Sequence, residues 1–328
     1  MSTPLLRTER LKKYFEVKRG FIRRSKGYVR AVDGVSLTLN RGEAISIVGE
    51  SGCGKTTLGK TILRLYEPIG GKIIFNNKDI TYLRWKDLKW YRRETGLIQQ
   101  DPFGALPSFM TTKGILQEPL IINGVKDKKE RMEKIYRSLE QVRLTPIEDF
   151  IGKYPHMLSG GQQQRLVIAR SIILEPKLII ADEPVSMLDA SVRVEILKLL
   201  QNLQRDYKLS IIYITHDLST TRYFSEMIYI MYAGHIVEGA STKEILKSPM
   251  HPYTKALLNV IPDPDPSNRL KVREVPAGEP PNLLSPPSGC RFNPRCINII
   301  KGVCDSKEPP MFEVDKDHYV KCWLYDHT

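Results

Sequence analysis

The strongest constraint on this chain is one glycine-rich loop between an apolar run at 44–48 and a helical run at 58–63. The loop fits the pattern G-x-x-x-x-G-K-[ST] and reads Gly49-Glu50-Ser51-Gly52-Cys53-Gly54-Lys55-Thr56. A strand, such a loop and a helix, in this order, bring backbone N–H groups together on phosphate oxygens at a helix N-terminus. The sequence therefore predicts an α/β protein with a phosphate-binding loop.

The residue types in this loop indicate a nucleoside triphosphate with magnesium. Lys55 is expected to bridge the β- and γ-phosphates, and the Thr56 hydroxyl to ligate Mg²⁺. We expect every loop residue and the following Thr57 to contact the nucleotide. Cys53 is expected to fill space in the loop and not to react.

A second apolar run, 178–181, ends in two carboxylates. Asp182 at the strand tip is placed to reach the magnesium shell. Glu183 is placed to orient a water against the γ-phosphate and to accept its proton. The pair therefore predicts a hydrolase.

The remaining pattern alternates strands and helices. Further strands are predicted at 31–48 (a pair), 72–75 and 210–214, and helices at 127–143, 161–174 and 190–206. Such alternation predicts a mostly parallel sheet.

The segment Leu158-Ser159-Gly160-Gly161-Gln162 is the most specific motif. Ser159 is expected to cap a helix, and the two glycines allow a close approach to phosphate. A phosphate loop, this segment and an Asp-Glu strand, in that order, resemble the ABC-transporter ATPase family. The resemblance covers about residues 1–245 and implies a P-loop NTPase ABC cassette. Such a cassette has a parallel-sheet RecA-like core, an antiparallel β subdomain and an α-helical subdomain, here about 101–175.

The resemblance assigns further residues. It implies that Gln100 senses Mg²⁺ and the membrane partner, that Asp189 contacts the opposite subunit, and that His216 touches the γ-phosphate. Phe15 is the first choice for stacking on adenine, with Tyr14 and Tyr28 as alternatives, because the basic segment 18–28 looks like an insertion in this loop.

The same resemblance has a mechanical implication for the signature segment, residues 158–162. In this family it binds the γ-phosphate held by the phosphate loop of another subunit, so two chains enclose two ATP molecules. ATP binding closes the pair and hydrolysis releases it.

Composition changes after about residue 245. Nine prolines lie in 252–287, and we expect neither regular helix nor central strand there. The run 248–258 (Ser-Pro-Met-His-Pro-Tyr-Thr, then Ala-Leu-Leu) resembles the C-terminal region of oligopeptide- and dipeptide-importer ATPases. The run 28–35 resembles the F member of their paired subunits. We therefore divide the chain into 1–245 and 246–328. Some members of the family that this chain resembles import oligosaccharides instead of peptides. The resemblance also implies that the ATPase does not contact the cargo, so its sequence does not distinguish the two.

Four of the five cysteines lie in this last region, at Cys290, Cys296, Cys304 and Cys322. Four thiolates can hold Zn²⁺ or an iron–sulfur cluster. The spacings are wider than those of structural zinc sites, and the subfamily resemblance favours a [4Fe–4S] cluster. A disulfide or no metal at all remains an alternative.

The net charge of +13 fits either binding to nucleic acid or contact with an anionic membrane surface or small ligand. More than half of it lies in residues 1–30, which hold ten Lys or Arg and only two acids. The leading hypothesis is the ATPase of an importer at the cytoplasmic face of the membrane, with no transmembrane segment or signal peptide of its own. Its partners would be a paralogous ATPase, two transmembrane permeases and an extracytoplasmic solute-binding protein, with no nucleic acid. The alternative is a soluble ABC ATPase that acts on ribosomes or nucleic acid.

Overall fold

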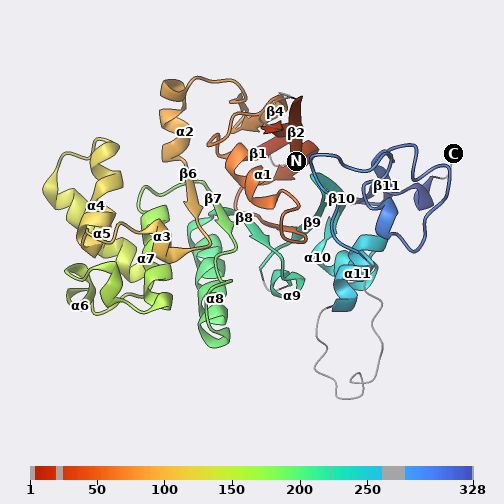
Figure 1. Ribbon diagram of the computed structural model, residues 1–328. Helices are drawn as coiled ribbons and strands as arrows, with labels where there is room; N and C mark the ends of the chain where they lie inside the picture. Colours follow the sequence, from red (N-terminus) through yellow and green to blue (C-terminus); the bar gives the residue numbers. More distant parts are fainter. Residues whose placement is uncertain (1–3, 20–24, 223, 261–277, 327–328) are drawn as a thin grey trace, which may run out of the picture. The chain divides into compact units, whose positions relative to one another are not determined.

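The computed structural model describes residues 4–19, 25–222, 224–260 and 278–326 (Figure 1). By internal contacts the chain divides into two units. The helix-rich unit comprises Asn40–Ala44 and Leu83–Tyr213; the strand-rich unit comprises Pro4–Leu39, Ile45–Tyr82 and Ile214–Thr328.

The helix-rich unit holds one end of a sheet in the order β8-β7-β6, and β6 pairs with β7 in parallel. Strand β7 contains the apolar run 178–181, and all five of its residues, Asp182 included, are buried. The elements are β6 (Thr95–Ile98), β7 (Leu178–Asp182), β8 (Ser210–Thr215), α2 (Lys89–Arg93), α3 (Pro102–Ala105), α4 (Thr112–Ile122), α5 (Lys128–Gln141), α6 (Glu148–Ile151), α7 (Gly160–Ile172) and α8 (Ala190–Tyr207).

Helices α4, α5 and α7 pack against one another. Helix α5 is amphipathic and buries Ile135 and Leu139 on one face, while its start is capped by the Asp127 carboxylate. The helices predicted at 127–143, 161–174 and 190–206 are confirmed within two or three residues. Helices α3 to α7 lie in the interval predicted for the helical subdomain, whose exact limits remain a prediction.

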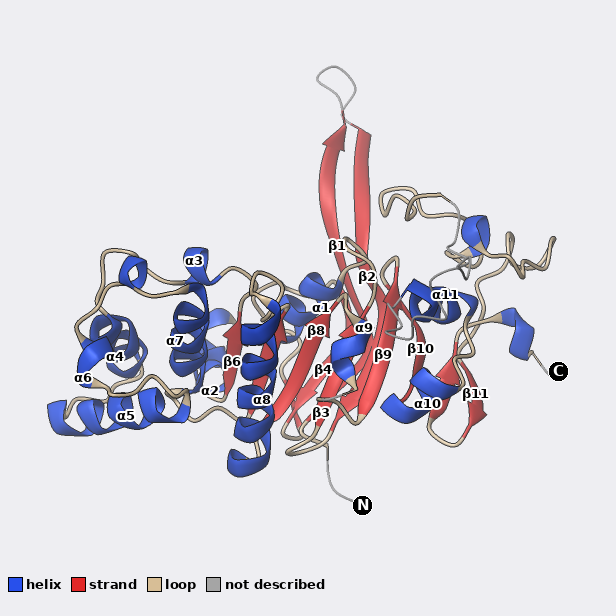
Figure 2. Cartoon of the chain, turned by 90° about the horizontal axis from the view of Figure 1, so that it is seen from below, coloured by secondary structure: helices blue, strands red, loops and turns tan. Residues whose placement is uncertain are grey.

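The strand-rich unit contains two sheets. The first is antiparallel, in the order β2-β1-β4-β5, and Figure 2 shows β1 and β2 side by side as a long ribbon. The second runs β11-β12-β10-β9-β3, and only the β3–β9 pair is parallel. The elements are β1 (Leu6–Arg19), β2 (Ser25–Leu39), β3 (Ala44–Val48), β4 (Gly70–Phe75), β5 (Lys78–Asp79), β9 (Met227–Tyr232), β10 (His235–Ser241), β11 (Phe312–Asp315), β12 (His318–Val320), α1 (Lys55–Ile62), α9 (Leu218–Thr221), α10 (Thr242–Lys247) and α11 (Pro252–Val260).

Two expectations need correction. Residues 18–19 and 25–28 are not loop but the ends of β1 and β2, whose pairing Val17↔Gly27 continues the ladder. Residues 252–260 form the helix α11, contrary to the expectation from proline content. Pro252 is the first residue of that helix, where a missing N–H costs nothing. The prolines at 262–276 lie outside the described residues.

Among the described residues, no helix is long and apolar enough to cross a membrane.

Candidate nucleotide site

The phosphate loop lies between β3 and α1 and leaves no space for larger residues at its two ends. A Cβ atom on Gly49 would lie 2.1 Å from the Met231 carbonyl oxygen. A Cβ on Gly54 would lie 2.0 Å from the Ala31 carbonyl oxygen, and Gly54 also has φ +109°. Both positions therefore require glycine.

Lys55, the first residue of α1, is buried in this loop. Its Nζ donates to the Gly49 carbonyl oxygen at 2.7 Å and to the Glu50 carbonyl oxygen at 3.0 Å. The ammonium group therefore lies within the curl of the loop. In contrast to Lys55, the neighbouring Ser51, Gly52 and Thr56 are exposed.

Cys53 is 6% exposed, and burial raises the pKa of its thiol to about 11. The thiol is neutral at physiological pH and therefore a poor nucleophile. Its backbone carbonyl accepts the Gly234 N–H at 2.8 Å, which ties the loop to the β9–β10 turn. The buried side chain of Cys53 thus occupies space inside the loop.

Asp182 and Glu183, the two carboxylates at the end of β7, differ in environment. Asp182 ends β7 and is 7% exposed. Glu183 follows with φ +46°, a left-handed conformation that is uncommon for residues other than glycine. The N–H and hydroxyl of Ser186 donate to its carbonyl oxygen at 3.2 and 3.1 Å. Such a conformation is often found where a side chain is aimed for chemistry.

The signature segment begins α7 with the predicted cap. Ser159 Oγ accepts the Gln162 N–H at 3.4 Å, and Gln162 Oε1 accepts the Ser159 N–H at 3.0 Å. Two of the backbone N–H groups at the helix start are thereby engaged. A Cβ atom on Gly161 would lie 2.7 Å from Val192 Cγ1, so α7 and α8 approach closely there.

The remaining predicted residues lie at element ends. Gln100 follows β6, Asp189 precedes α8 and His216 follows β8, and all three are exposed. The helix-rich unit thus contains Gln100, Ser159, Gly160, Gly161, Gln162, Asp182, Glu183 and Asp189; the strand-rich unit contains Phe15, the whole phosphate loop, Thr57, His216 and the four late cysteines.

The three aromatic candidates for stacking on adenine lie in different environments. The Phe15 ring packs edge-on against Tyr66, with 5.3 Å between centroids. The Tyr14 hydroxyl instead donates to Asp33 at 2.6 Å, and burial raises the pKa of Tyr14 to about 12. Tyr28 is 49% exposed.

Two residues that the sequence did not assign to the site contact the phosphate loop. The Glu50 N–H donates to Tyr253 Oη at 2.9 Å, and Arg295 donates to the Glu50 carboxylate at 2.9 and 3.2 Å. Tyr253 lies in the run 248–258, whose resemblance to importer ATPases is the sequence feature that could have pointed to this residue. Nothing in the sequence singled out Arg295.

The four late cysteines share one environment in the strand-rich unit. Burial, together with the neighbouring Cys290, Cys296 and Cys304, raises the pKa of the Cys322 thiol to about 12. Cys290 donates its N–H to the Cys304 carbonyl at 2.8 Å. In the described part of the chain, however, no three His, Cys, Asp or Glu side chains are grouped to hold a metal ion.

A sheet with a phosphate loop, a carboxylate-tipped strand and a capped signature helix defines an ABC-type ATPase cassette. The "ABC transporter" family model matches residues 32–186, and the "Oligopeptide/dipeptide transporter, C-terminal region" model matches 237–302. The dimeric structure of an ATP-binding cassette in a post-hydrolysis state, bound to ADP and Pi, superposes with a TM-score of 0.64 at 28% identity, over 72% of this chain and 98% of that one.

Two relatives narrow the class. The oligopeptide transport ATP-binding protein AppF of Bacillus subtilis is 42% identical over 98% of this chain and 97% of its own. The dipeptide transport ATP-binding protein DppF of Haemophilus influenzae is 39% identical over 99% of this chain and 98% of its own. The chain belongs to the ABC transporter family, as an ATPase subunit of the oligopeptide/dipeptide importer type.

Proposed function

We propose that this chain hydrolyses ATP at the cytoplasmic face of a membrane to drive the uptake of short peptides. The carrying observation is that the phosphate loop with its buried Lys55, the strained Glu183 and the capped signature helix all occur in one chain. The match at 237–302 and the peptide-transport relatives support peptides over oligosaccharides as cargo.

The residues divide the chemistry among them. Glu183 orients the attacking water and accepts its proton, while Lys55 and His216 stabilise charge on the γ-phosphate. The chemistry of the donor set suits Mg²⁺, because hydroxyl, carboxylate and amide oxygens are its preferred ligands. Thr56, Asp182 and Gln100 are the residues that would hold the ion. Bound Mg²⁺ would neutralise charge on the β- and γ-oxygens.

A second ATPase completes each nucleotide site. Ser159 and Asp189 are exposed, and a Cβ atom on Gly160 would come no closer than 3.8 Å to a neighbouring side chain, that of Leu188. We propose that this open face binds the γ-phosphate on a paralogous subunit, so that two different ATPases close on two ATP molecules.

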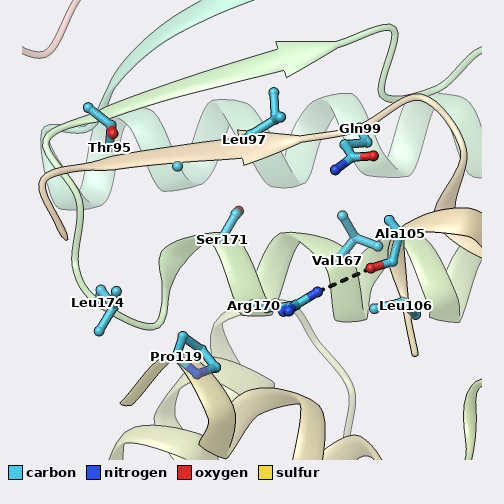
Figure 3. A pocket seen from close by; sticks show the side chains of 11 residues that line it. Thr95, Leu97, Gln99, Ala105, Leu106, Pro119, Val167, Arg170, Ser171 and Leu174 are labelled. Atoms are coloured by element: carbon cyan, nitrogen blue, oxygen red, sulfur yellow. Dashed lines mark hydrogen bonds between the residues drawn. The ribbon is translucent and has the colours of Figure 1, made fainter. Parts of the chain in front are cut away.

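A groove in the helix-rich unit is the proposed permease contact. It has a volume of about 200 Å³ and is lined by β6, α3, α4 and α7 (Figure 3). Arg170 is one of the residues that line it, and one of its guanidinium nitrogens donates to the Ala105 carbonyl at 3.1 Å while another donates to Glu118 at 2.7 Å. The groove borders Gln99, next to the predicted sensor Gln100, so an element seated there would affect the nucleotide site.

The late cysteines are proposed to bind a [4Fe–4S] cluster. Four neighbouring thiols are the required donor set. Zn²⁺ is the weaker alternative, because the spacings between these cysteines in the sequence are wider than those of structural zinc sites. A bound cluster would clip together a tail that has little core of its own.

The central test pairs hydrolysis with uptake. The Glu183→Gln variant should bind MgATP normally but hydrolyse it at least about 100-fold more slowly, because its amide cannot accept the proton. Cells that lack this chain should lose uptake of labelled di- to pentapeptides and regain it with the wild type, but not with this variant. Uptake that survives without the chain would contradict the proposed function.

The cluster has its own test. Anaerobically purified protein should be brown with broad absorbance near 400 nm, and Cys296→Ser should remove the colour. A colourless protein containing zinc would contradict the cluster.

A further inference from the structure

We propose that the C-terminal segment positions the phosphate loop by holding Glu50, with Arg295 and Tyr253 as positioning residues that set nucleotide affinity. This inference rests on the proposed nucleotide site. It adds to that site a part of the chain whose contacts with Glu50 span 203 and 245 residues of sequence and which carries none of the nucleotide motifs.

Every polar group of Glu50 is engaged. Its carboxylate accepts two hydrogen bonds from Arg295, and its N–H donates to Tyr253 Oη. Its carbonyl oxygen accepts from Lys55 Nζ at 3.0 Å. One residue therefore joins the C-terminal segment to the lysine that is expected to meet the γ-phosphate.

The two positioning side chains are themselves fixed. The Arg295 side chain is 8% exposed, and Nη1 also donates to Tyr232 Oη at 3.4 Å. Tyr253 is fully buried, and its ring contacts the rings of Tyr232 and Phe292 at centroid distances of 4.5 and 5.5 Å. Such packing holds a charge-assisted pair in one geometry, which is the condition under which it contributes more than a surface ion pair.

A second anchor lies four residues before Arg295 in sequence. Arg291 donates to the Ala233 carbonyl and to the Asp33 carboxylate. Ala233 precedes Gly234, whose N–H binds the carbonyl of Cys53 in the phosphate loop. Arg291 and Arg295 thus hold the loop from two directions.

Both arginines lie between Cys290 and Cys296, and these two cysteines pack against the same core cluster as Tyr253 and Val48. The fold of the cysteine segment and the shape of the phosphate loop are therefore parts of one packed structure. Damage to the segment should appear as weaker nucleotide binding.

The test measures binding of a fluorescent ATP analogue to the full chain. Arg295→Gln should raise the Kd about five- to tenfold, the usual loss for one partly buried charge-assisted pair. Arg295→Lys should recover part of this loss. Lys301→Gln, an exposed change in the same tail, should leave the Kd unchanged.

Coupling to Glu50 separates positioning from a general structural role. The Glu50→Gln and Arg295→Gln changes should each raise the Kd, and the double variant should be no worse than the poorer single one. In steady-state ATP hydrolysis by Arg295→Gln, KM should rise while kcat stays within about twofold, since the contacts with Glu50 act on nucleotide binding and not on the chemical step.

Three outcomes would overturn the inference. One is an unchanged Kd in Arg295→Gln, even if its melting temperature falls. Another is strict additivity in the double variant. The third is failure of the wild type to bind ATP at all, which would overturn the proposed function as well and is thereby distinguished from the first two. Tyr253→Phe offers a milder second variant, with an expected rise of about two- to threefold.

Discussion

Two glycine-rich segments begin helices in this protein, and they are built in opposite ways. The phosphate loop before α1 is closed by its own chain: Lys55 is buried within it, and Gly49 has no space for a Cβ atom. The signature segment before α7 is open: Ser159 is exposed, and Gly160 has space for a side chain.

The difference shows what each glycine is for. At Gly49 the requirement comes from the fold, because the Met231 carbonyl occupies the only available space. At Gly160 the fold sets no such requirement. A nucleotide that approaches from a partner subunit, as proposed above, would supply a reason for glycine at this position.

The largest expected effect is at Lys55. Lys55→Ala should reduce ATP hydrolysis at least about 100-fold, because it removes the charge that is proposed to stabilise the γ-phosphate. It should also weaken binding of the nucleotide to the isolated chain. Lys60→Ala, on the same helix, is the matched control and should hydrolyse ATP at the wild-type rate in the complex with the partner subunits.

Ser159→Arg should separate the two segments. Hydrolysis by the assembled complex should fall about 100-fold, since a bulky side chain would fill the position that is proposed to contact the γ-phosphate on the partner subunit. Binding of ATP by the isolated chain should be unchanged, because its own phosphate loop is intact. Equal loss of binding in the isolated chain would show that the signature segment serves the nucleotide of its own subunit.

A matched glycine pair tests the stated cause directly. Gly49→Ala should destabilise the fold by about 3 kcal/mol or more, because the added carbon overlaps a backbone oxygen that cannot move freely. Gly160→Ala should be neutral or stabilising by up to about 1 kcal/mol, since alanine favours helices. Urea unfolding of both variants measures the difference. Equal destabilisation would refute the contrast.

The sequence predicted the phosphate loop, the buried strand β7 and the Ser159 cap because each depends on local rules. A strand–loop–helix motif, an apolar run and a capping box are all specified within about ten residues. The fold class follows from these elements and their order.

The sequence could not predict contacts made over long separations. Arg295 and Glu50 are polar residues with no pattern around them, and only the folded chain brings them together. The helix α11 was missed because proline content was weighed without the position of Pro252, which suits a helix start. The hairpin of β11 and β12 was missed because two strands of three or four residues carry little periodicity.

The smallest expected effect concerns His251, two residues before Tyr253. Burial lowers the pKa of His251 to about 3, and its Nδ1 accepts the Tyr253 N–H at 3.0 Å. The folded chain therefore keeps this ring neutral, while the unfolded chain protonates it near pH 6.5. Its contribution to stability is complete above pH 6.5 and is lost as pH falls from 6.5 towards 3, by up to about 1.4 kcal/mol per pH unit.

His251→Asn keeps an acceptor for the Tyr253 N–H but removes the titration. Its melting temperature should fall less steeply between pH 7 and pH 5 than that of the wild type. His156→Asn, at an exposed histidine of the helix-rich unit, should keep the wild-type slope. If the melting temperatures of the two variants fall equally steeply with pH, His251 is not the source of the acid sensitivity. If only His251→Asn makes the melting temperature less dependent on pH, protonation of His251 destabilises the surroundings of the phosphate loop. Nucleotide binding at pH 5 should then weaken in the wild type more than in this variant.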